Sequence, residues 1–223
     1  MLLAGTGLES TRATIALTRR AADAGADAAL VLTPSYYKPQ MSPEALRRHF
    51  EAVADASPIP VLLYSVPQFT GIPFPGALAP ALAAHPRIRG MKESSGDVGL
   101  LGRIKGSVPD SFSVLCGAAA VFYPALCVGA SGGVLAVASC APRPVAALYR
   151  AFERGDHAAA RRLQEALTPL ATAVTTAHGV AGLKAAMDAA GRRGGAVRPP
   201  LLPAAVSLEA EIPALLARAE AAV

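Results

Sequence analysis

Lysine is rare in this chain, and one lysine lies where a nucleophilic amine would be useful. Of the 21 basic residues only four are lysine, and Lys92 lies near the end of the apolar run IRGMKES. If that run is a buried strand of a parallel α/β fold, its carboxyl end borders the ligand site. Burial there disfavours the charged ammonium, and a neutral amine can attack a carbonyl carbon to form a Schiff base. The alternative is a surface lysine or an ion-pair partner of Glu93.

Tyr64 occupies a similar position at the end of a second apolar run, PVLLYSV. A phenol at a strand end can relay a proton beside a reacting carbonyl, although a half-buried tyrosine with a satisfied hydroxyl is the simpler interpretation. The segment TPSYYKP sets Tyr36 and Tyr37 between prolines, in a stiff loop that could be a lid, an interface or packing. The glycines of GASGG, residues 129–133, permit close backbone approach to a ligand, or only a tight turn.

Six short apolar runs alternate with amphipathic segments along the chain. The runs span residues 1–5, 28–33, 60–66, 88–94, 112–117 and 132–137. Each is bounded by Gly, Pro or polar residues, which is typical of strands buried on both faces of a parallel sheet. The expected helices span residues 10–24, a segment that opens at Ser42, and residues 74–84, 98–107, 118–129, 143–154, 157–177, 180–190 and 207–223. The alternation indicates βαβ units with right-handed crossovers, in a doubly wound sheet or a (β/α)8 barrel.

Of these two architectures, we favour an α/β (β/α)8 barrel that lacks its first two βα units. A barrel needs eight strands, whereas only six are visible, and the chain opens inside an apolar strand at Met1-Leu2-Leu3. We therefore expect a partial barrel over residues 1–156 and a C-terminal helical extension over residues 157–223. A Pro/Gly-rich loop is expected at residues 191–206. A six-stranded open sheet is the alternative.

Composition and charge exclude several classes of protein. Hydrophobic residues make up 52% and charged residues 17% of the chain, which indicates a folded domain with a core. No apolar run approaches the ~20 residues of a membrane-spanning helix, and no leader is evident, so we expect a cytoplasmic protein. The net charge of +5 comes from scattered pairs rather than a basic stripe, which argues against nucleic-acid binding. The three cysteines are expected in the core and the histidines at the surface or on helices, so no metal site is predicted.

Taken in order, the motifs resemble the dihydrodipicolinate synthase / N-acetylneuraminate lyase family of class I aldolases. The strings that carry the resemblance are AGTGLEST, TPSYYKP, LLYSVPQFTG, GMKESSGD, VLCGAA and GASGGVLAV, which together extend over nearly the whole chain. Within the family, the chain looks most similar to 4-hydroxy-2-oxoglutarate aldolase. The resemblance implies a (β/α)8 barrel with a C-terminal helical extension, and a homodimer or homotetramer. It also implies a pyruvate-type 2-oxo acid substrate and no cofactor.

The resemblance also implies roles for particular residues. Lys92 matches the lysine that forms the Schiff base, and Tyr64 matches the catalytic tyrosine that relays a proton beside the imine. Tyr36 aligns with a tyrosine that reaches across a dimer interface, and Tyr37 is the second choice for that position. A further pair, Gly133 and Val134, falls where backbone groups border the bound keto acid.

The chain departs from the family pattern in two places. The Gly-Thr/Ser-rich loop that binds the substrate carboxylate would lie before residue 1, and Phe69 stands where dihydrodipicolinate synthases carry an arginine. We therefore expect cleavage of 4-hydroxy-2-oxoglutarate to pyruvate and glyoxylate through a lysine imine. One alternative is 4-hydroxy-tetrahydrodipicolinate synthase, which joins pyruvate to aspartate semialdehyde. The other is a truncated, non-catalytic remnant that binds 2-oxo acids or only oligomerises.

Overall fold

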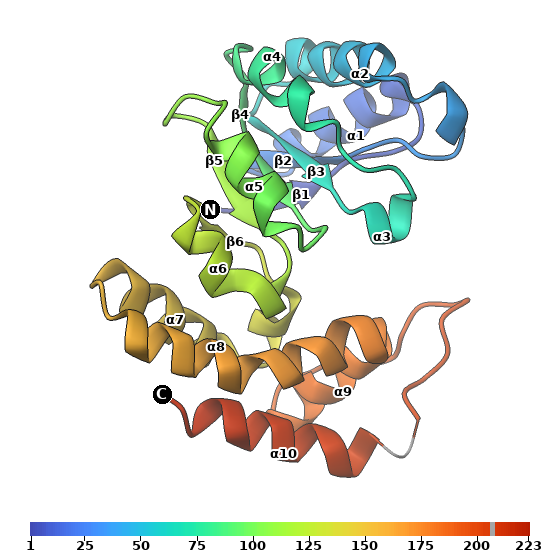
Figure 1. Ribbon diagram of the computed structural model, residues 1–223. Helices are drawn as coiled ribbons and strands as arrows, with labels where there is room; N and C mark the ends of the chain where they lie inside the picture. The colour runs from blue at the N-terminus through green and yellow to red at the C-terminus, as the bar shows by residue number, and fades with distance from the viewer. Residues whose placement is uncertain (206–207) are drawn as a thin grey trace. The chain divides into compact units, whose positions relative to one another are not determined.

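The computed structural model describes residues 1–205 and 208–223 (Figure 1). These residues form two compact units, one of residues 1–116 with 128–132 and the other of residues 117–127 with 133–223. The units therefore do not follow the boundary expected between residues 156 and 157. Residues 206 and 207, where the expected loop ends and the last helix begins, lie outside the described residues.

The α/β architecture is confirmed, and the described residues form six strands in one sheet. The strands are β1 (Leu3–Gly5), β2 (Ala28–Leu32), β3 (Val61–Ser65), β4 (Ile88–Glu93), β5 (Ser113–Cys116) and β6 (Gly132–Gly133). Each strand neighbours the next one in sequence, and the pairs from β1–β2 to β4–β5 are parallel. This sequential parallel order is that of a partial barrel.

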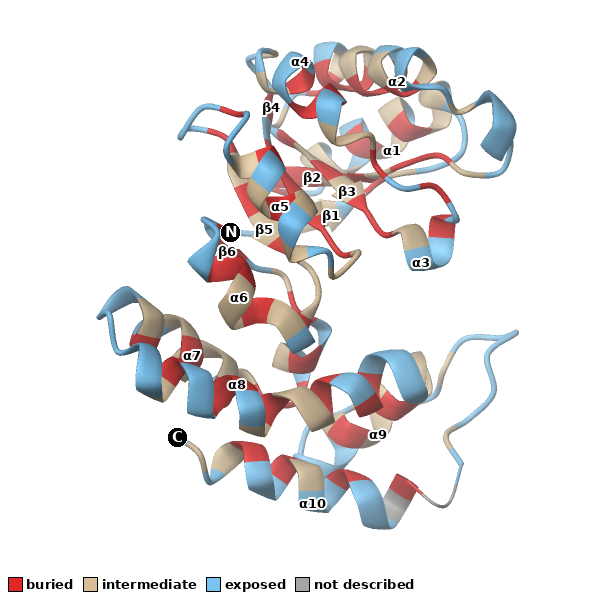
Figure 2. Cartoon of the chain, viewed as in Figure 1, coloured by how far each residue is buried: buried red, intermediate tan, exposed pale blue. Residues whose placement is uncertain are grey.

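Polar caps and prolines set the starts of the helices in the first unit. Its helices are α1 (Thr11–Asp23), α2 (Pro43–Ala56), α3 (Pro67–Thr70), α4 (Ala79–Ala83) and α5 (Val98–Lys105). The hydroxyls of Ser10 and Ser42 and the carboxylate of Asp97 accept hydrogen bonds from the first turns of α1, α2 and α5. In Figure 2 these helices carry buried residues on one side and exposed residues on the other, as amphipathic helices beside a sheet do.

The second unit is helical. It contains α6 (Phe122–Cys127), α7 (Pro142–Glu153), α8 (His157–Thr172), α9 (Gly179–Ala189) and α10 (Leu208–Glu220). Helix α8 packs against α7 and α10, and α10 also packs against α9. None of the described helices is long and apolar enough to cross a membrane.

Several expected boundaries were wrong for local reasons. The run 132–137 is a strand only at Gly132–Gly133, because the chain then forms a 3-10 turn, Ala136–Ser139, with its own short-range hydrogen bonds. The expected helix 74–84 is a 3-10 turn followed by the five-residue α4, in a segment rich in proline. The helix expected over residues 118–129 is likewise a 3-10 turn and then α6. Helix α3, which begins at Pro67 directly after β3, was not predicted.

The cysteines divide between the core and the surface. Cys116 and Cys140 are buried as expected, whereas Cys127 is exposed, and no disulfide joins the three. Burial raises the pKa of the Cys140 thiol to about 11. The Cys140 thiol is therefore a poor nucleophile at neutral pH.

Gly90 on β4 lies close to the backbone of the neighbouring strand β5. A Cβ atom there would lie 2.4 Å from the carbonyl oxygen of Ser113 on β5. We predict that Gly90→Ala lowers stability by about 1–3 kcal/mol, because the strands must separate to admit the methyl group. Thermal denaturation measures the effect. Gly5→Ala is the matched control, because a Cβ on Gly5 of β1 meets nothing within 4 Å; an equal effect at both sites would contradict the prediction.

Candidate active site

The carboxyl ends of β3 and β4 bring the two predicted catalytic residues together. The parallel register pairs Tyr64 with Lys92 and Ser65 with Glu93. This register follows a shift after Val61, which pairs with Ile88, whereas the next residue of β3 pairs with Gly90. Without the shift, Tyr64 would pair with Met91. Lys92 would then pair with Ser65, whose side chain lies on the face of β3 opposite to that of Tyr64. The irregularity therefore puts the amine and the phenol on one face of the sheet.

Lys92 lies against the ring of Tyr64. Its Nζ atom is 4.2 Å from the centroid of the ring, which is the geometry of a cation–π contact. Both residues are half-buried, whereas Leu63 and Met91, on the opposite face of the strands, are fully buried. The amine is therefore only partly withdrawn from solvent, which is less burial than the sequence suggested.

The backbone at this end of the sheet is held by hydrogen bonds beyond the strands. The carbonyl oxygen of Tyr64 accepts bonds from both the backbone nitrogen and the hydroxyl of Thr33, each at 3.2 Å. The backbone nitrogen of Ser94 donates to the carbonyl oxygen of Ser65 at 2.9 Å. These bonds extend the ladder past the last strand residues, so the positions of Tyr64 and Lys92 are fixed on both sides.

Glu93, the residue after Lys92, is a buried carboxylate, for which the sequence indicated no role beyond an ion pair with that lysine. Only 2% of its surface is exposed. Its oxygens accept hydrogen bonds from the Ser95 backbone nitrogen, the Ser95 hydroxyl at 2.8 Å and the Ser65 hydroxyl at 3.4 Å. Burial raises its pKa above the ordinary value; the hydrogen bonds from Ser95 and Ser65 act in the opposite direction, and the charge of Asp97 adds to the rise.

Helix α3 places Gln68 and Phe69 beside this end of the sheet. The Gln68 side-chain amide donates to the carbonyl oxygens of Ser94 and Ser95 at 2.8 and 3.0 Å. Phe69 is 85% exposed, which is unusual for a large apolar side chain. An aromatic ring is therefore presented to solvent four residues after β3 ends.

Tyr36 and Tyr37 lie in an exposed loop that Glu9 holds. Their rings pack edge to face with centroids 5.0 Å apart, and their exposed fractions are 76% and 67%. The Glu9 carboxylate accepts hydrogen bonds from the backbone nitrogens of Ser35 and Tyr36, each at 2.8 Å. Among the described residues no ring contact joins Tyr36 to Lys92 or Tyr64, so its role stays a prediction.

Gly133 and Val134 belong to the second compact unit. Gly133 is exposed and ends β6, and Val134 is half-buried. Their predicted place beside a bound keto acid stays a prediction.

His49 was expected at the surface or on a helix, and the structure buries it on α2. Its Nδ1 atom is 2.9 Å from the Thr11 hydroxyl, and its Nε2 atom has no hydrogen-bond partner in the described structure. Burial lowers its pKa, and the charge of Glu9 acts in the opposite direction. The amphipathic pattern of α2 could have revealed this burial, because Leu46, Phe50 and Val53 lie on the same apolar stripe.

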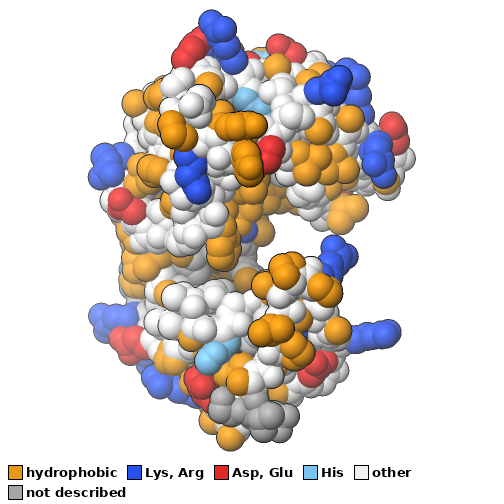
Figure 3. Space-filling model, turned by 90° about the vertical axis from the view of Figure 1, so that its right-hand side faces the viewer, with side chains coloured by type: hydrophobic (Ala, Val, Ile, Leu, Met, Phe, Trp, Pro, Cys, Tyr) orange, Lys and Arg blue, Asp and Glu red, His pale blue; other side chains and the backbone are white. Residues whose placement is uncertain are grey.

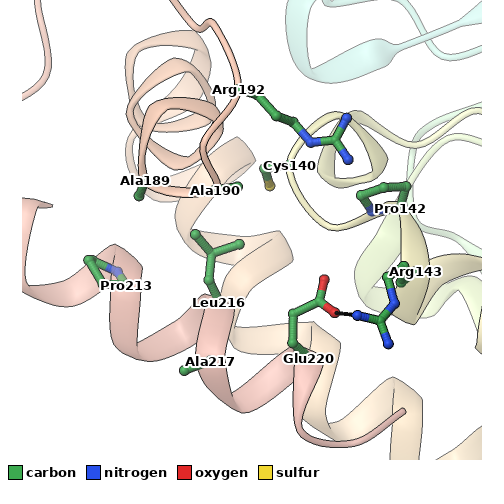
Figure 4. A pocket seen from close by; sticks show the side chains of 10 residues that line it. All are labelled: Cys140, Pro142, Arg143, Ala189, Ala190, Arg192, Pro213, Leu216, Ala217 and Glu220. Carbon is green, nitrogen blue, oxygen red and sulfur yellow. Dashed lines mark ion pairs between the residues drawn. The ribbon is translucent and has the colours of Figure 1, made fainter.

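A pocket of about 500 Å³ lies in the second unit and contains none of the predicted site residues (Figure 4). It is lined by α7, α9, α10 and neighbouring residues, and Arg143 forms an ion pair with Glu220 at 3.6 Å across one side. On the face drawn in Figure 3, Lys and Arg side chains lie apart from one another rather than in a stripe. No group of three or more His, Cys, Asp or Glu that could hold a metal occurs among the residues described.

The chain is similar to a known family and to several known proteins. The model of the "Dihydrodipicolinate synthetase family" matches residues 1–219. The "4-hydroxy-tetrahydrodipicolinate synthase" of Exiguobacterium sp. is 38% identical over 212 residues, which are 95% of this chain and 72% of the relative. A dihydrodipicolinate synthase structure from Bacillus anthracis superposes with a TM-score of 0.91 at 30% identity, over 96% of this chain and 73% of that one. The structure of a prophage protein of E. coli K12, solved in complex with pyruvate, superposes with a TM-score of 0.88 at 32% identity. The match covers 98% of this chain and 74% of that one.

The parallel βα sheet with a lysine and a tyrosine at adjacent strand ends defines an α/β enzyme of the class I aldolase type. The chain belongs to the dihydrodipicolinate synthetase family. It spans about seven tenths of the length of these relatives. The expected likeness to 4-hydroxy-2-oxoglutarate aldolase is not supported, because the relatives found carry the name of the alternative, 4-hydroxy-tetrahydrodipicolinate synthase.

The raised pKa of Glu93 predicts how stability depends on pH. The folded state binds the proton of this carboxyl more tightly than the unfolded chain does, so ionisation costs stability once the pH rises above about 4.5, the ordinary value. The melting temperature of Glu93→Gln relative to the unmodified protein should therefore rise as the pH increases from 5 to 8. Glu165→Gln, at an exposed site on α8, is the control and should show a constant difference. A constant difference for Glu93→Gln as well would contradict the prediction.

Proposed function

We propose that this chain joins pyruvate to an aldehyde through an imine on Lys92, and that the aldehyde is aspartate semialdehyde. The observation that carries the proposal is the contact between the Lys92 amine and the Tyr64 ring at the ends of two paired strands. The names of the relatives support the choice of aldehyde, because they are 4-hydroxy-tetrahydrodipicolinate synthases. The complex of one structural relative with pyruvate supports the 2-oxo acid.

In the proposed reaction the Lys92 amine attacks the keto carbon of pyruvate, and loss of water gives a protonated imine. The imine draws electrons from the neighbouring carbon, which loses a proton to become an enamine. The enamine carbon attacks the aldehyde carbon, and Tyr64 supplies a proton to the oxygen that forms. Attack on the product imine by water, or by the amino group of the semialdehyde part, releases the product and regenerates the Lys92 amine. The imine polarises the substrate, so the proposed reaction needs no metal or organic cofactor.

Replacement of the two catalytic residues tests this proposal. Lys92→Ala should abolish consumption of pyruvate and aspartate semialdehyde, because no other group in the proposal forms the imine. Tyr64→Phe should lower kcat about 100-fold or more, the usual contribution of a general acid–base group, and should still allow the imine to form. Lys105→Ala, which removes an ion pair with the exposed Asp110 and leaves the Lys92–Tyr64 pair untouched, is the matched control. Substantial turnover by Lys92→Ala would overturn the proposal.

Phe69 favours a second candidate, the cleavage of 4-hydroxy-2-oxoglutarate to pyruvate and glyoxylate. This exposed ring stands where the family pattern has an arginine that could hold the carboxylate of aspartate semialdehyde. An aromatic ring makes no such bidentate bond, and a substrate that does not depend on the arginine would tolerate the change. Both reactions use the same imine, so a side-by-side assay of the two substrates decides between them.

The Phe69→Arg variant makes this comparison quantitative. A charge-assisted hydrogen bond is worth about 1.5–3 kcal/mol, so the variant should raise kcat/KM for aspartate semialdehyde about tenfold or more. Formation of the pyruvate imine should not change, because Phe69 lies outside the lysine–tyrosine pair. If kcat/KM for aspartate semialdehyde is unchanged, position 69 does not select the aldehyde.

A further inference from the structure

Glu93 is buried at the end of β4 without a positive partner. Among the described residues it forms no ion pair with a lysine or arginine, and the Nζ atom of its neighbour Lys92 lies against the Tyr64 ring. Because successive side chains of a strand point to opposite faces, Glu93 and Lys92 project to opposite sides of the sheet. The charge that acts on Glu93 from the next helix is that of Asp97, which is also negative.

A buried, unpaired carboxylate is a cost to the folded state. Removing a charged group from water is unfavourable unless opposite charge and hydrogen bonds replace the water. Its hydrogen-bond donors among the described residues, Ser65 and Ser95, are neutral, and a neutral residue of similar size would fill the space with less penalty. Stability alone therefore does not account for a carboxylate at this position. The hydrogen bonds that the carboxylate accepts indicate its role.

These hydrogen bonds fasten the residues that directly follow Lys92. Both carboxylate oxygens accept from the backbone nitrogen of Ser95, at 3.0 and 3.1 Å, and one of them also accepts from the Ser95 hydroxyl. The Ser65 hydroxyl joins the same carboxylate from β3, directly after Tyr64. The carboxylate thus links the strand that carries the phenol to the turn that follows the amine.

A second side chain holds the same turn from outside. Gln68 on α3 donates to the carbonyl oxygens of Ser94 and Ser95. Since α3 begins two residues after β3 ends, this contact also runs from the Tyr64 strand to the turn after Lys92. The turn is therefore fixed by a buried carboxylate on one side and an exposed amide on the other.

We propose that Glu93 is a positioning residue for Lys92, which anchors the turn at Ser94–Ser95 to β3 and so fixes the direction from which the amine meets the 2-oxo acid. The proposal rests on the imine chemistry proposed above. A displacement of about 1 Å at a reacting group can lower a rate about 100-fold, so loosening this anchor should slow imine formation while the fold persists.

The test is a time course of imine formation with pyruvate. Borohydride traps the imine, and mass spectrometry measures the fraction of the chains that are modified at Lys92. Glu93→Gln should slow trapping about tenfold or more and still reach full modification of the chain. A loss of folded protein would instead reduce the final yield, so rate and yield separate positioning from folding. Glu93→Asp, which keeps the charge on a shorter side chain, should recover part of the rate, and Glu165→Gln on α8 should match the unmodified protein.

A normal trapping rate in folded Glu93→Gln would overturn the inference and leave the proposed function intact. Absence of any imine in the unmodified folded protein would overturn the proposed function, and this inference with it. If Glu93→Gln does not fold, Gln68→Ala provides the test, because Gln68 is exposed and holds the same turn. Gln68→Ala should slow trapping with a full final yield, and an unchanged rate in that case would overturn the inference.

Discussion

The register between β3 and β4 is the constraint on which the candidate site depends. Side chains alternate between the two faces of a strand, so a shift of one residue decides which side chains share a face. The irregularity after Val61 pairs Tyr64 with Lys92, and the close approach of Gly90 to Ser113 leaves no room for a side chain near that point. The same register puts Ser65 beside Glu93, which brings the carboxylate to the turn that follows Lys92. The lysine–tyrosine pair and the carboxylate beside it therefore depend on one feature of the backbone.

The sequence predicted much of the fold, because buried parallel strands are continuous apolar runs and several helices begin at a polar cap or a proline. It also predicted that Lys92 and Tyr64 lie at the ends of apolar strands, and the structure pairs them there; their catalytic roles stay a proposal. It could not predict the register shift, because a shift depends on the pairing of two strands rather than on either one alone. It missed α3 and overestimated β6, since short elements depend on local hydrogen bonds more than on hydrophobic pattern.

The polar interior was the least predictable part. Glu93 follows a lysine in the motif KESS, and adjacent opposite charges suggest an ion pair, whereas strand alternation sends the two side chains to opposite faces. His49 is a different case, because the apolar stripe of Leu46, Phe50 and Val53 on α2 could have revealed its burial. The identity of the aldehyde substrate was harder still to predict from the sequence. The names of the relatives and the exposed ring of Phe69 support different second substrates, although both depend on the same imine.

The imine on Lys92 is the central claim, and its direct detection is the most informative measurement. The folded chain is incubated with pyruvate, reduced with borohydride, digested and mapped by mass spectrometry, with Lys92→Ala in parallel. The account predicts a reduced pyruvate adduct on the peptide that contains Lys92, and no adduct in the variant. An adduct on another lysine, an adduct that persists in Lys92→Ala, or no adduct on a cooperatively folded chain would contradict it.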